Sequence, residues 1–425
     1  MASASLATED ILIVGAGPAG ATASLFLAQA GIPHTLVDKA VFPRDKVDGN
    51  VFGAKVIDVF NRLSSDYFPA LMAQRDRVQV STGCRVFTPN GKHFDLKFQA
   101  KAAKQEGISA RVPFFTVNRC HFDQFLLDQL DKRYVDIHLG SAIAAIYRQS
   151  DRWRVTLAHA DAVTELTPQL IIAADGAASF TAQQLESSRK GSRRLSGKHS
   201  GPSCYDSVQG YFRNVEGCVT VASTNGSSAS GAGIEGHFLP EVNPAFFFIT
   251  PLAGNLFSVG AVRARREADA TENLTQIVTN AIAHHPNLAP RFARSERVQE
   301  LRPWPIALGS AWKRAVSGPG YLLTGDAAGL CNPLTCFGTG NAMISGQLAA
   351  EAVQRAIASP DLFTADLGTY DRALYRQLQS EFQIGSLLNT LIGQDWLFNQ
   401  LTSSHPIQTM ARRVLRRPLA KLRQM

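Results

Sequence analysis

Residues 10–38 read DILIVGAGPAGATASLFLAQAGIPHTLVD, and this stretch decides the fold. Residues 10–14 (DILIV) are expected to form a short buried strand, and residues 21–30 have the composition of a helix that ends before Gly31. A second strand is expected at residues 33–37 (PHTLV). A strand, a glycine-rich turn, a helix and a strand in this order predict a β-α-β unit that opens an α/β domain.

The turn of this unit, GAGPAG at residues 15–20, matches the dinucleotide fingerprint G-x-G-x-x-G. Gly15 permits the tight turn, Gly17 lets the backbone approach a pyrophosphate, and Gly20 lets helix and strand pack closely. The free N–H groups of the helix N-terminus favour the phosphate charge. Asp38 lies 18 residues beyond Gly20, where an acid accepts hydrogen bonds from ribose hydroxyls. These features together predict dinucleotide binding, although the motif alone also occurs in unrelated glycine-rich loops.

Composition narrows the class of protein. The 425 residues allow two or three domains, or one large two-lobed enzyme. With 45% hydrophobic and 18% charged residues, the chain is too apolar to be intrinsically disordered. Its six Cys form no CxxC pair, and its His pair at residues 284–285 has no third ligand at metal spacing, so we expect no metal. The net charge of +8 favours anionic partners.

Two further motifs follow apolar strand-like runs. Residues 173–179 read AADGAAS, and residues 321–329 read YLLTGDAAG. Together with RCHFD at residues 119–123, they resemble the FAD-binding motifs of a large flavoprotein superfamily. That superfamily includes para-hydroxybenzoate hydroxylase, flavin-dependent halogenases and geranylgeranyl reductases.

A narrower resemblance is to the geranylgeranyl reductase family of FAD-dependent oxidoreductases. It rests on GDAAGLCNPLTCFGTGNAMISG at residues 325–346, FPRDKVDG at residues 42–49 and GAKVID at residues 53–58. The resemblance is strong in the nucleotide-binding segments and thin in the strand-rich middle of the chain. It implies one tightly but noncovalently bound FAD.

The resemblance also implies roles for individual residues. Asp326 would bind the ribityl chain, Asp175 and Gly176 would lie near the pyrophosphate, and Arg119 would reach the cofactor from its helix. With the fingerprint included, the expected cofactor-binding residues are Gly15, Gly17, Pro18, Ala19, Gly20, Asp38, Lys39, Arg44, Arg119, Asp175, Gly176, Gly325, Asp326, Pro333, Gly338, Thr339 and Gly340.

The segment NPLTCFGTG at residues 332–340 opens the long helix expected at residues 338–357. Pro333, Gly338 and Gly340 allow backbone N–H groups to converge on one point. Such a positive pole suits the N1–C2=O edge of a reduced, anionic flavin.

An α/β pattern returns near residue 320 after a strand-rich stretch, which predicts an interrupted domain. The expected fold class is α/β: a Rossmann-like FAD-binding domain with an inserted sheet-rich substrate domain and C-terminal helices. The expected segments are residues 1–76, 111–180 and 300–360 for the FAD-binding domain, residues 77–110 and 181–299 for the substrate domain, and residues 361–425 for a helical region with a basic tail.

The favoured reaction is hydride transfer from reduced FAD to a carbon–carbon double bond of an apolar, isoprenoid-type small molecule. Phe246 and Phe248 are expected to line its pocket. Only one dinucleotide fingerprint is present, so NAD(P)H would visit without its own Rossmann domain, or a protein donor would supply the electrons. The alternative is a flavin-dependent monooxygenase or halogenase that acts through a C4a-hydroperoxide in a dry pocket. A third reading is a flavin-bound scaffold without activity.

Asp48 is the expected proton donor. The resemblance places its loop beside the flavin, with Asp48-Gly49 where the reductases usually carry Cys-Gly. A carboxylic acid enclosed in a low-dielectric pocket favours its protonated form and can donate a proton. The alternative is that Asp48 caps a turn before Gly49, or pairs with Lys46 or Arg44.

Two stretches of the chain are rich in basic residues. Residues 181–203 are rich in Ser, Gly, Lys and Arg and predict an exposed excursion. Residues 410–425 (MARRVLRRPLAKLRQM) predict either peripheral contact with anionic membranes or an ordinary solvated tail. The N-terminus lacks a secretory signal, so we expect a cytoplasmic protein, with any membrane contact peripheral. Nucleic-acid binding has no support in the predicted fold, and the sequence does not predict an oligomeric state.

Overall fold

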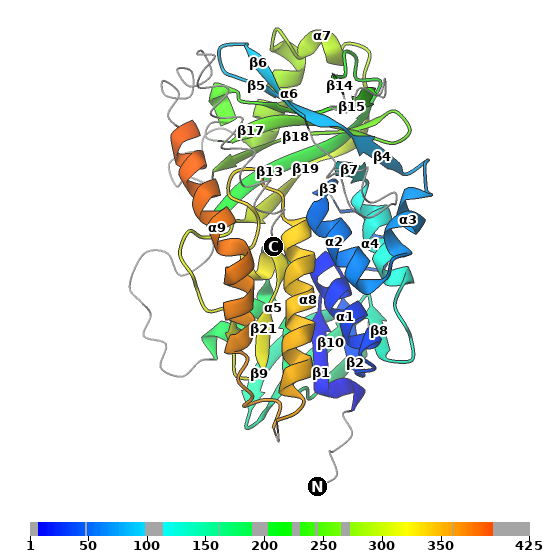
Figure 1. The fold of residues 1–425 in the computed structure, drawn as a ribbon, viewed down its shortest axis with the longest axis vertical. Coiled ribbons are helices and arrows are strands. Elements are labelled where there is room, and N and C mark those ends of the chain that lie inside the picture. The colour runs from blue at the N-terminus through cyan, green and yellow to red at the C-terminus, as the bar shows by residue number, and fades with distance from the viewer. Residues whose placement is uncertain are drawn as a thin grey trace.

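The computed structural model describes residues 7–46, 49–97, 114–160, 162–188, 203–222, 230–242, 245–264, 273–359 and 361–393. A layered α/β part carries the N-terminus, and a sheet-rich part is stacked on one end of it (Figure 1). Two long helices, α8 (Thr339–Ala356) and α9 (Gly368–Ile392), run along the front of the molecule. The predicted α/β fold class is confirmed.

The α/β part is built on a six-stranded sheet with the order β20-β21-β12-β1-β2-β8. All neighbours are parallel except β20 and β21. Strand β1 lies between β2 and β12, so successive strands are added first on one side of β1 and then on the other. The bounds are β1 (Ile11–Val14), β2 (His34–Asp38), β8 (Val135–Leu139), β12 (Leu170–Ala173), β20 (Ser317–Gly318) and β21 (Tyr321–Leu323).

This sheet is covered on both faces. Helix α1 (Pro18–Gln29) packs on one face between α8 and α4 (Arg119–Asp128). A three-stranded antiparallel sheet packs on the other face through Trp153, whose Nε1 donates to the carbonyl of Gly320 at 2.8 Å. All of β1 is buried as a result, which explains its unbroken apolar sequence. The bounds of the small sheet are β9 (Ala142–Gln149), β10 (Arg152–His159) and β11 (Ala162–Leu166).

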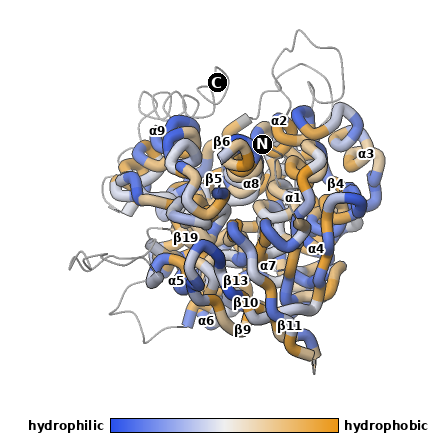
Figure 2. The backbone as a smooth tube through the Cα atoms, turned by 90° about the horizontal axis from the view of Figure 1, so that it is seen from below, coloured by the Kyte–Doolittle hydropathy of each residue, from blue (hydrophilic) through white to orange (hydrophobic). Residues whose placement is uncertain are grey.

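The view along the long axis shows the same layering. Segments of hydrophobic residues surround α1 and α8, whereas segments of hydrophilic residues are frequent at the rim (Figure 2). The remaining short elements are η1 (Thr8–Asp10), α2 (Ala54–Leu63), α3 (Tyr67–Met72), β14 (Thr220–Ala222), β15 (Ser230–Ala232), η3 (Pro240–Val242) and η4 (Gly325–Ala328). Among the described helices, none combines the length and the apolar composition that a membrane crossing needs.

The sheet-rich part holds seven strands in the order β19-β13-β18-β17-β16-β5-β6. Two helices cover one face, where Phe247, Val259 and Ile277 are buried together. The opposite face carries a smaller cluster that contains Tyr205 and Cys331, so this face is turned toward the loop before α8. The bounds are β5 (Gly83–Phe87), β6 (His93–Lys97), β13 (Cys204–Arg213), β16 (Ile234–His237), β17 (Phe246–Leu252), β18 (Leu256–Ala264), β19 (Glu296–Ala307), α6 (Leu274–His284) and α7 (Ala289–Phe292).

The division into domains stays a prediction. The seven-stranded sheet extends beyond residue 299, the expected end of the substrate domain, because β19 continues to Ala307. A small sheet with the order β3-β7-β4 lies between the two large ones, and its Thr116 hydroxyl donates to the carbonyl of Pro251 at 2.6 Å. Its bounds are β3 (Val51–Gly53), β4 (Val78–Ser81) and β7 (Phe114–Val117).

One expected loop contains a helix. The exposed excursion predicted over residues 181–203 begins with α5 (Phe180–Ser187). The side chain of Ser179 caps this helix by accepting a hydrogen bond from the backbone N of Ala182 at 2.8 Å, and Leu185 is fully buried. The polar composition hid this short apolar face. Residues 189–202 lie outside the described residues.

Helix α9 connects the two large parts. The hydroxyl of Tyr370, near its start, donates to the carbonyl of Leu323 in the six-stranded sheet at 2.7 Å. Asn389, near its end, donates from its side chain to the hydroxyl of Tyr205 in the seven-stranded sheet. The helix therefore holds both sheets in one arrangement.

Candidate cofactor-binding site

The expected site residues meet at one edge of the six-stranded sheet. Gly15 follows β1, Asp38 ends β2, Asp175 follows β12, and Gly325 follows β21. These four strands are parallel, so their carboxyl ends lie at the same edge. In open α/β sheets, ligands bind outside this edge at the point where the strand order reverses. Here that point is the end of β1.

The turn after β1 requires glycine. Gly15 has a φ of +104°, and a Cβ there would lie 2.4 Å from the carbonyl oxygen of Ala174. A Cβ on Gly20 would lie 1.8 Å from the carbonyl oxygen of Gly15. Gly17 is the N-cap of α1 and provides no side-chain cap, so the N–H groups of the first turn face outward without one. Such an N-terminus favours a phosphate.

Arg44 supplies a positive charge at this N-terminus. A Cβ on Gly17 would lie 3.2 Å from Nη2 of Arg44. Nε of Arg44 is buried without a hydrogen-bond partner in the described part of the chain. Buried donors are rarely left unpaired in proteins, so this nitrogen fits an oxygen of a bound ligand. The residues present therefore fit the pyrophosphate of FAD.

Asp38 organises the backbone around the turn. Its Oδ2 accepts a hydrogen bond from the N of Ala16, and its Oδ1 accepts one from the N of Ala40, both at 2.8 Å. Each carboxylate oxygen keeps a further lone pair, which a ribose hydroxyl can use. Lys39 is exposed to solvent.

A buried ion pair stands beside the turn. Arg119 donates from Nε and Nη2 to the two carboxylate oxygens of Asp123 at 2.7 and 2.8 Å, and both residues are buried. A Cβ on Gly49 would lie 3.2 Å from Nη1 of Arg119 and 3.2 Å from Oγ1 of Thr339. The structure thus brings together Gly49, the start of α4 and the start of α8.

Asp175 and Gly176 differ in what they face. The carboxylate of Asp175 accepts hydrogen bonds from the hydroxyl of Ser179 and, at 3.0 Å, from the N of Thr181. It therefore caps α5. Gly176 has a φ of +88°, and nothing lies within 4 Å of the position that a Cβ would take. Its backbone borders open space, as the approach of a ligand requires.

The turn after β21 packs directly on α1 and α8. Gly325 has a φ of +54°, its N donates to Oγ of Ser345 at 2.9 Å, and a Cβ there would lie 3.0 Å from Cβ of Ala19. Asp326 follows and approaches the start of α8, because a Cβ on Gly338 would lie 3.3 Å from its Oδ1. Only residues without bulk allow this contact, which joins the two helix N-termini.

The loop before α8 is held by its own side chains. Oδ1 of Asn332 accepts hydrogen bonds from the N of Leu334 and the N of Thr335, both at 2.9 Å. Cys336 has a φ of +56°, and Gly338 is an N-cap without a side-chain cap. Pro333, Thr339 and Gly340 lie in this loop and the first turn of α8. The resulting positive pole fits the expected flavin edge.

Sequence reasoning missed a polar network behind this loop. Nζ of Lys55 pairs with Glu381 and also bonds to Oδ1 of Asn341 at 2.5 Å. The other oxygen of Glu381 accepts from Nδ2 of Asn332 at 2.8 Å. A Cβ on Gly385 would lie 3.2 Å from Cδ of Pro333. One face of α9 therefore rests on the loop, a contact that no local pattern in the sequence signals.

Asn50 is a second residue that sequence reasoning missed. Its Oδ1 accepts hydrogen bonds from the N of Arg119 at 3.2 Å and from the hydroxyl of Tyr211 at 3.4 Å. Its Nδ2 is buried, and within the described residues it has no partner. Asn50 lies at the junction of the two parts, where it could donate to cofactor or substrate.

Half-buried aromatic side chains lie near the start of α8. Phe246 and Phe248 share one face of β17, with ring centroids 6.5 Å apart, and Phe248 packs on the cluster that contains Cys331. Phe114 and the exposed Phe337 have ring centroids 6.5 Å apart. These rings give an apolar surface at the expected substrate side. Asp48 lies outside the described residues, although the neighbouring Gly49 reaches the site.

Comparisons with known proteins bear on the family and the fold of this chain. A digeranylgeranylglycerophospholipid reductase of Methanocaldococcus jannaschii is 24% identical over 396 residues, which cover 90% of this chain and 87% of the relative. A geranylgeranyl bacteriochlorophyll reductase-like protein of Thermoplasma acidophilum has a TM-score of 0.74 at 18% identity, covering 92% of this chain and 90% of that one. A flavin-dependent brominase has a TM-score of 0.71 at 16% identity, covering 96% and 92%.

The two solved structures show the shared fold alone, because their sequence identity is low. The family is shown by sequence: the model of the FAD binding domain family matches residues 8–350, which include the turn after β1 and the start of α8. The chain belongs to the FAD binding domain family and is an enzyme of the FAD-dependent oxidoreductases.

Proposed function

We propose that this enzyme reduces a carbon–carbon double bond of an apolar, isoprenoid-type substrate. The observation that supports it most is the juxtaposition at the start of α8, where a helix N-terminus without a side-chain cap meets the aromatic rings of Phe114 and Phe337. The name of the reductase relative, which concerns geranylgeranyl chains, supports the same substrate class. Bound FAD would supply the hydride.

In this proposal the protein binds and orients. The first turn of α1 and Arg44 would hold the pyrophosphate, Asp38 the ribose, and Asp326 the ribityl chain. The N–H groups at the start of α8 would stabilise negative charge on the flavin. Phe246 and Phe248 hold the apolar substrate and exclude water.

The proton would come from Asp48. Its neighbour Gly49 lies against Arg119 and Thr339, which supports a place for the loop at the start of α8. A carboxyl group in that position would donate to the carbon that does not receive the hydride. Asp48→Asn should retain FAD and its reduction by a donor, but slow substrate reduction by roughly 10²–10⁴-fold.

Single-turnover kinetics under anaerobic conditions measure this effect. Asp45→Asn is the matched control, because Asp45 is in the same loop and forms an exposed ion pair with Arg302. The control should leave the rate within about twofold, as is usual for surface substitutions. Equal rates for wild-type protein and Asp48→Asn would remove Asp48 from the mechanism.

The reaction class is tested first. The enzyme is reduced anaerobically with NADH, NADPH or dithionite and then mixed with an unsaturated geranylgeranyl lipid. We expect substrate-dependent reoxidation of the flavin and a product that has gained two hydrogen atoms. Reoxidation by O₂ with a product that contains oxygen, or halogen when halide is present, would favour a monooxygenase or halogenase. The fold shared with the brominase makes that the second candidate.

A further inference from the structure

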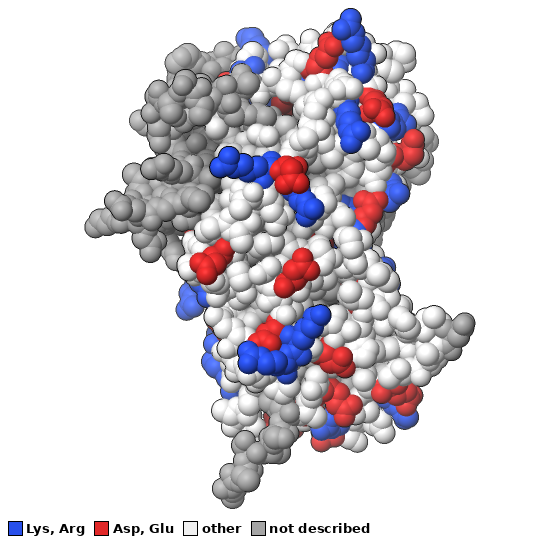
Figure 3. Space-filling model, turned by 90° about the vertical axis from the view of Figure 1, so that its right-hand side faces the viewer, with Lys and Arg blue, Asp and Glu red and all other residues white. Residues whose placement is uncertain are grey.

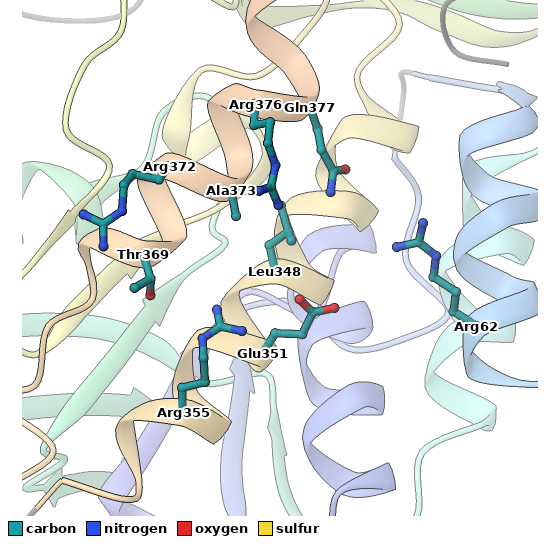
Figure 4. Close-up of a pocket in the computed structure, with 9 residues that line it drawn as sticks. All are labelled: Arg62, Leu348, Glu351, Arg355, Thr369, Arg372, Ala373, Arg376 and Gln377. Atoms are coloured by element: carbon teal, nitrogen blue, oxygen red, sulfur yellow. The ribbon is translucent and has the colours of Figure 1, made fainter. Parts of the chain in front are cut away.

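A groove on the outer surface, between α2, α8 and α9, is lined by four arginines from three helices (Figure 4). Its volume is about 390 Å³. Arg62 comes from α2, Arg355 from α8, and Arg372 and Arg376 from α9. Leu348, which is 4% exposed, also lines the groove.

The positive charge of this arginine groove is poorly compensated. Glu351 is the one carboxylate in its lining, and its Oε1 accepts a hydrogen bond from Gln347 at 2.7 Å. Arg372 lies 3.6 Å from Asp366, but both side chains are at least 70% exposed. Within the described ranges, no carboxylate lies within ion-pair distance of the other three arginines.

Helix dipoles explain only half of this arrangement. Arg62 and Arg355 lie in the last turns of α2 and α8, where a cation is favourable. Arg372 and Arg376 lie in the N-terminal half of α9 and are four residues apart, so their like charges repel on one helix face. An anion bound between the helices would offset this repulsion.

The face shown in Figure 3 has a different pattern of charge from this groove. On the face shown in Figure 3, basic and acidic side chains alternate and most of the surface is uncharged. The close-up in Figure 4 shows the guanidinium groups of Arg355 and Arg376 on either side of Leu348, with Arg62 facing them across the groove. Planar guanidinium groups recognise phosphate oxygens with paired hydrogen bonds.

We propose that the arginine groove binds a phosphate-bearing anion. Its size suits one or two phosphate groups with a small apolar contact on Leu348. The site is separate from the cofactor site, because Leu348 lies nine residues beyond Thr339 on α8, which is about 14 Å along a helix. The proposal goes beyond the proposed reaction and does not depend on it. A free organic phosphate and a phospholipid headgroup share the required chemistry.

The test uses the full-length, FAD-loaded protein, so that the cofactor site is filled. Inorganic pyrophosphate is titrated by calorimetry, and vesicles of phosphatidylcholine with or without phosphatidylglycerol are sedimented with the protein at low salt. The test variant is Arg355→Gln with Arg376→Gln. The matched control is Arg133→Gln with Arg294→Gln, which removes the same charge from side chains that are 78% and 85% exposed elsewhere.

We expect the test variant to bind pyrophosphate, or the anionic vesicles, at least about tenfold more weakly than wild type, because two charge-assisted contacts are lost. The control variant should bind like wild type, and all three proteins should carry equal FAD. If the test variant loses pyrophosphate binding, the ligand is a soluble phosphate. If the test variant loses only vesicle binding, the ligand is a phospholipid headgroup. No binding of either probe by wild type, or equal binding by the test variant and wild type, overturns the proposal.

Discussion

At the scale of single residues, the glycines around α1 differ in what a side chain would strike. At Gly15 and Gly20 a Cβ would enter neighbouring backbone, so substitution there damages the fold itself. At Gly17 the nearest atom is the flexible end of Arg44, so the fold can survive a substitution. A substitution at Gly17 therefore tests cofactor binding while the fold is retained.

We expect Gly17→Val to abolish FAD binding, because a branched side chain would occupy the space that the pyrophosphate needs. Absorbance after denaturation measures the flavin, which should appear in the supernatant of wild type because we predict noncovalent binding. Gly236→Ala is the control, since nothing lies within 4 Å of a Cβ at that position. A Gly17→Val protein that purifies with full flavin would contradict the assignment of the motif.

His34 links the stability of this domain to pH. It is the first residue of β2 and is fully buried against α1; its Nδ1 donates to the carbonyl of Ile32 at 2.9 Å, and its Nε2 bonds to Ser24 of α1 at 2.6 Å. Burial lowers the pKa of His34 from 6.5 to about 4, against a smaller opposing effect of the Ile32 carbonyl. The folded protein thus resists a proton that the unfolded chain accepts.

The sign follows from proton linkage. The stabilising contribution of neutral His34 is complete above pH 6.5 and is lost as the pH falls toward 4, by about 3 kcal/mol in total. His34→Gln should flatten this part of the dependence, while it lowers stability at neutral pH. Urea unfolding at several pH values measures both. A pH profile of the variant that runs parallel to that of wild type would exclude His34 as its cause.

Some residue positions could be read from the sequence, and others could not. The glycines of the fingerprint and Asp38 meet at the sheet edge, as the spacing predicts. The carboxylate of Asp175 caps α5 because Ser179 and Thr181 follow it closely, and a motif at a strand end does not reveal that choice. The unpaired nitrogens of Arg44 and Asn50 depend on distant segments, so sequence alone could not find them.

At the scale of elements, local patterns predicted β1 (Ile11–Val14) and the long helix α8 (Thr339–Ala356), because both are set by neighbours in sequence. They did not predict that β4 pairs with β7, whose partner residues are more than thirty positions away. The support of the loop before α8 by α9 was missed for the same reason. Long-range pairing leaves no periodicity in either segment.

The contact between α9 and this loop should matter for flavin affinity. Glu381→Gln removes the charge that holds Lys55 and Asn332, and the pair is at most 16% exposed. We expect the variant to bind FAD about tenfold more weakly than wild type, because the largely buried charge of Lys55 is left without a counter-charge. Flavin fluorescence on dilution measures the affinity.

Glu165→Gln controls for the chemical change. Glu165 lies on the exposed strand β11 and pairs with Arg154 of β10. Loss of this exposed ion pair should leave the flavin affinity unchanged. Lys55→Met should reproduce the effect of Glu381→Gln if the ion pair is the cause. Wild-type affinity in both variants would show that α9 only packs on the loop.

At the scale of the whole molecule, part of the net charge of +8 comes from the basic residues of the tail at residues 410–425. These residues lie outside the described part of the chain. Truncation after Gln408 should weaken binding to anionic liposomes, because each basic residue near such a surface contributes about 1 kcal/mol. Sedimentation at low salt measures binding, and FAD content should not change. Equal sedimentation of both forms would discard a membrane role for the tail.

The order of strands in the six-stranded sheet has a consequence for synthesis on the ribosome. Strands β1 and β21 begin 310 residues apart (321 minus 11), although only β12 separates them in the sheet. At about 5–20 residues per second, they leave the ribosome roughly 15–60 s apart. During that interval the nascent chain exposes one apolar edge of an unfinished sheet. The edge is open to chaperones for most of translation. The turn after β21 and the start of α8 are the last parts of the cofactor site to form.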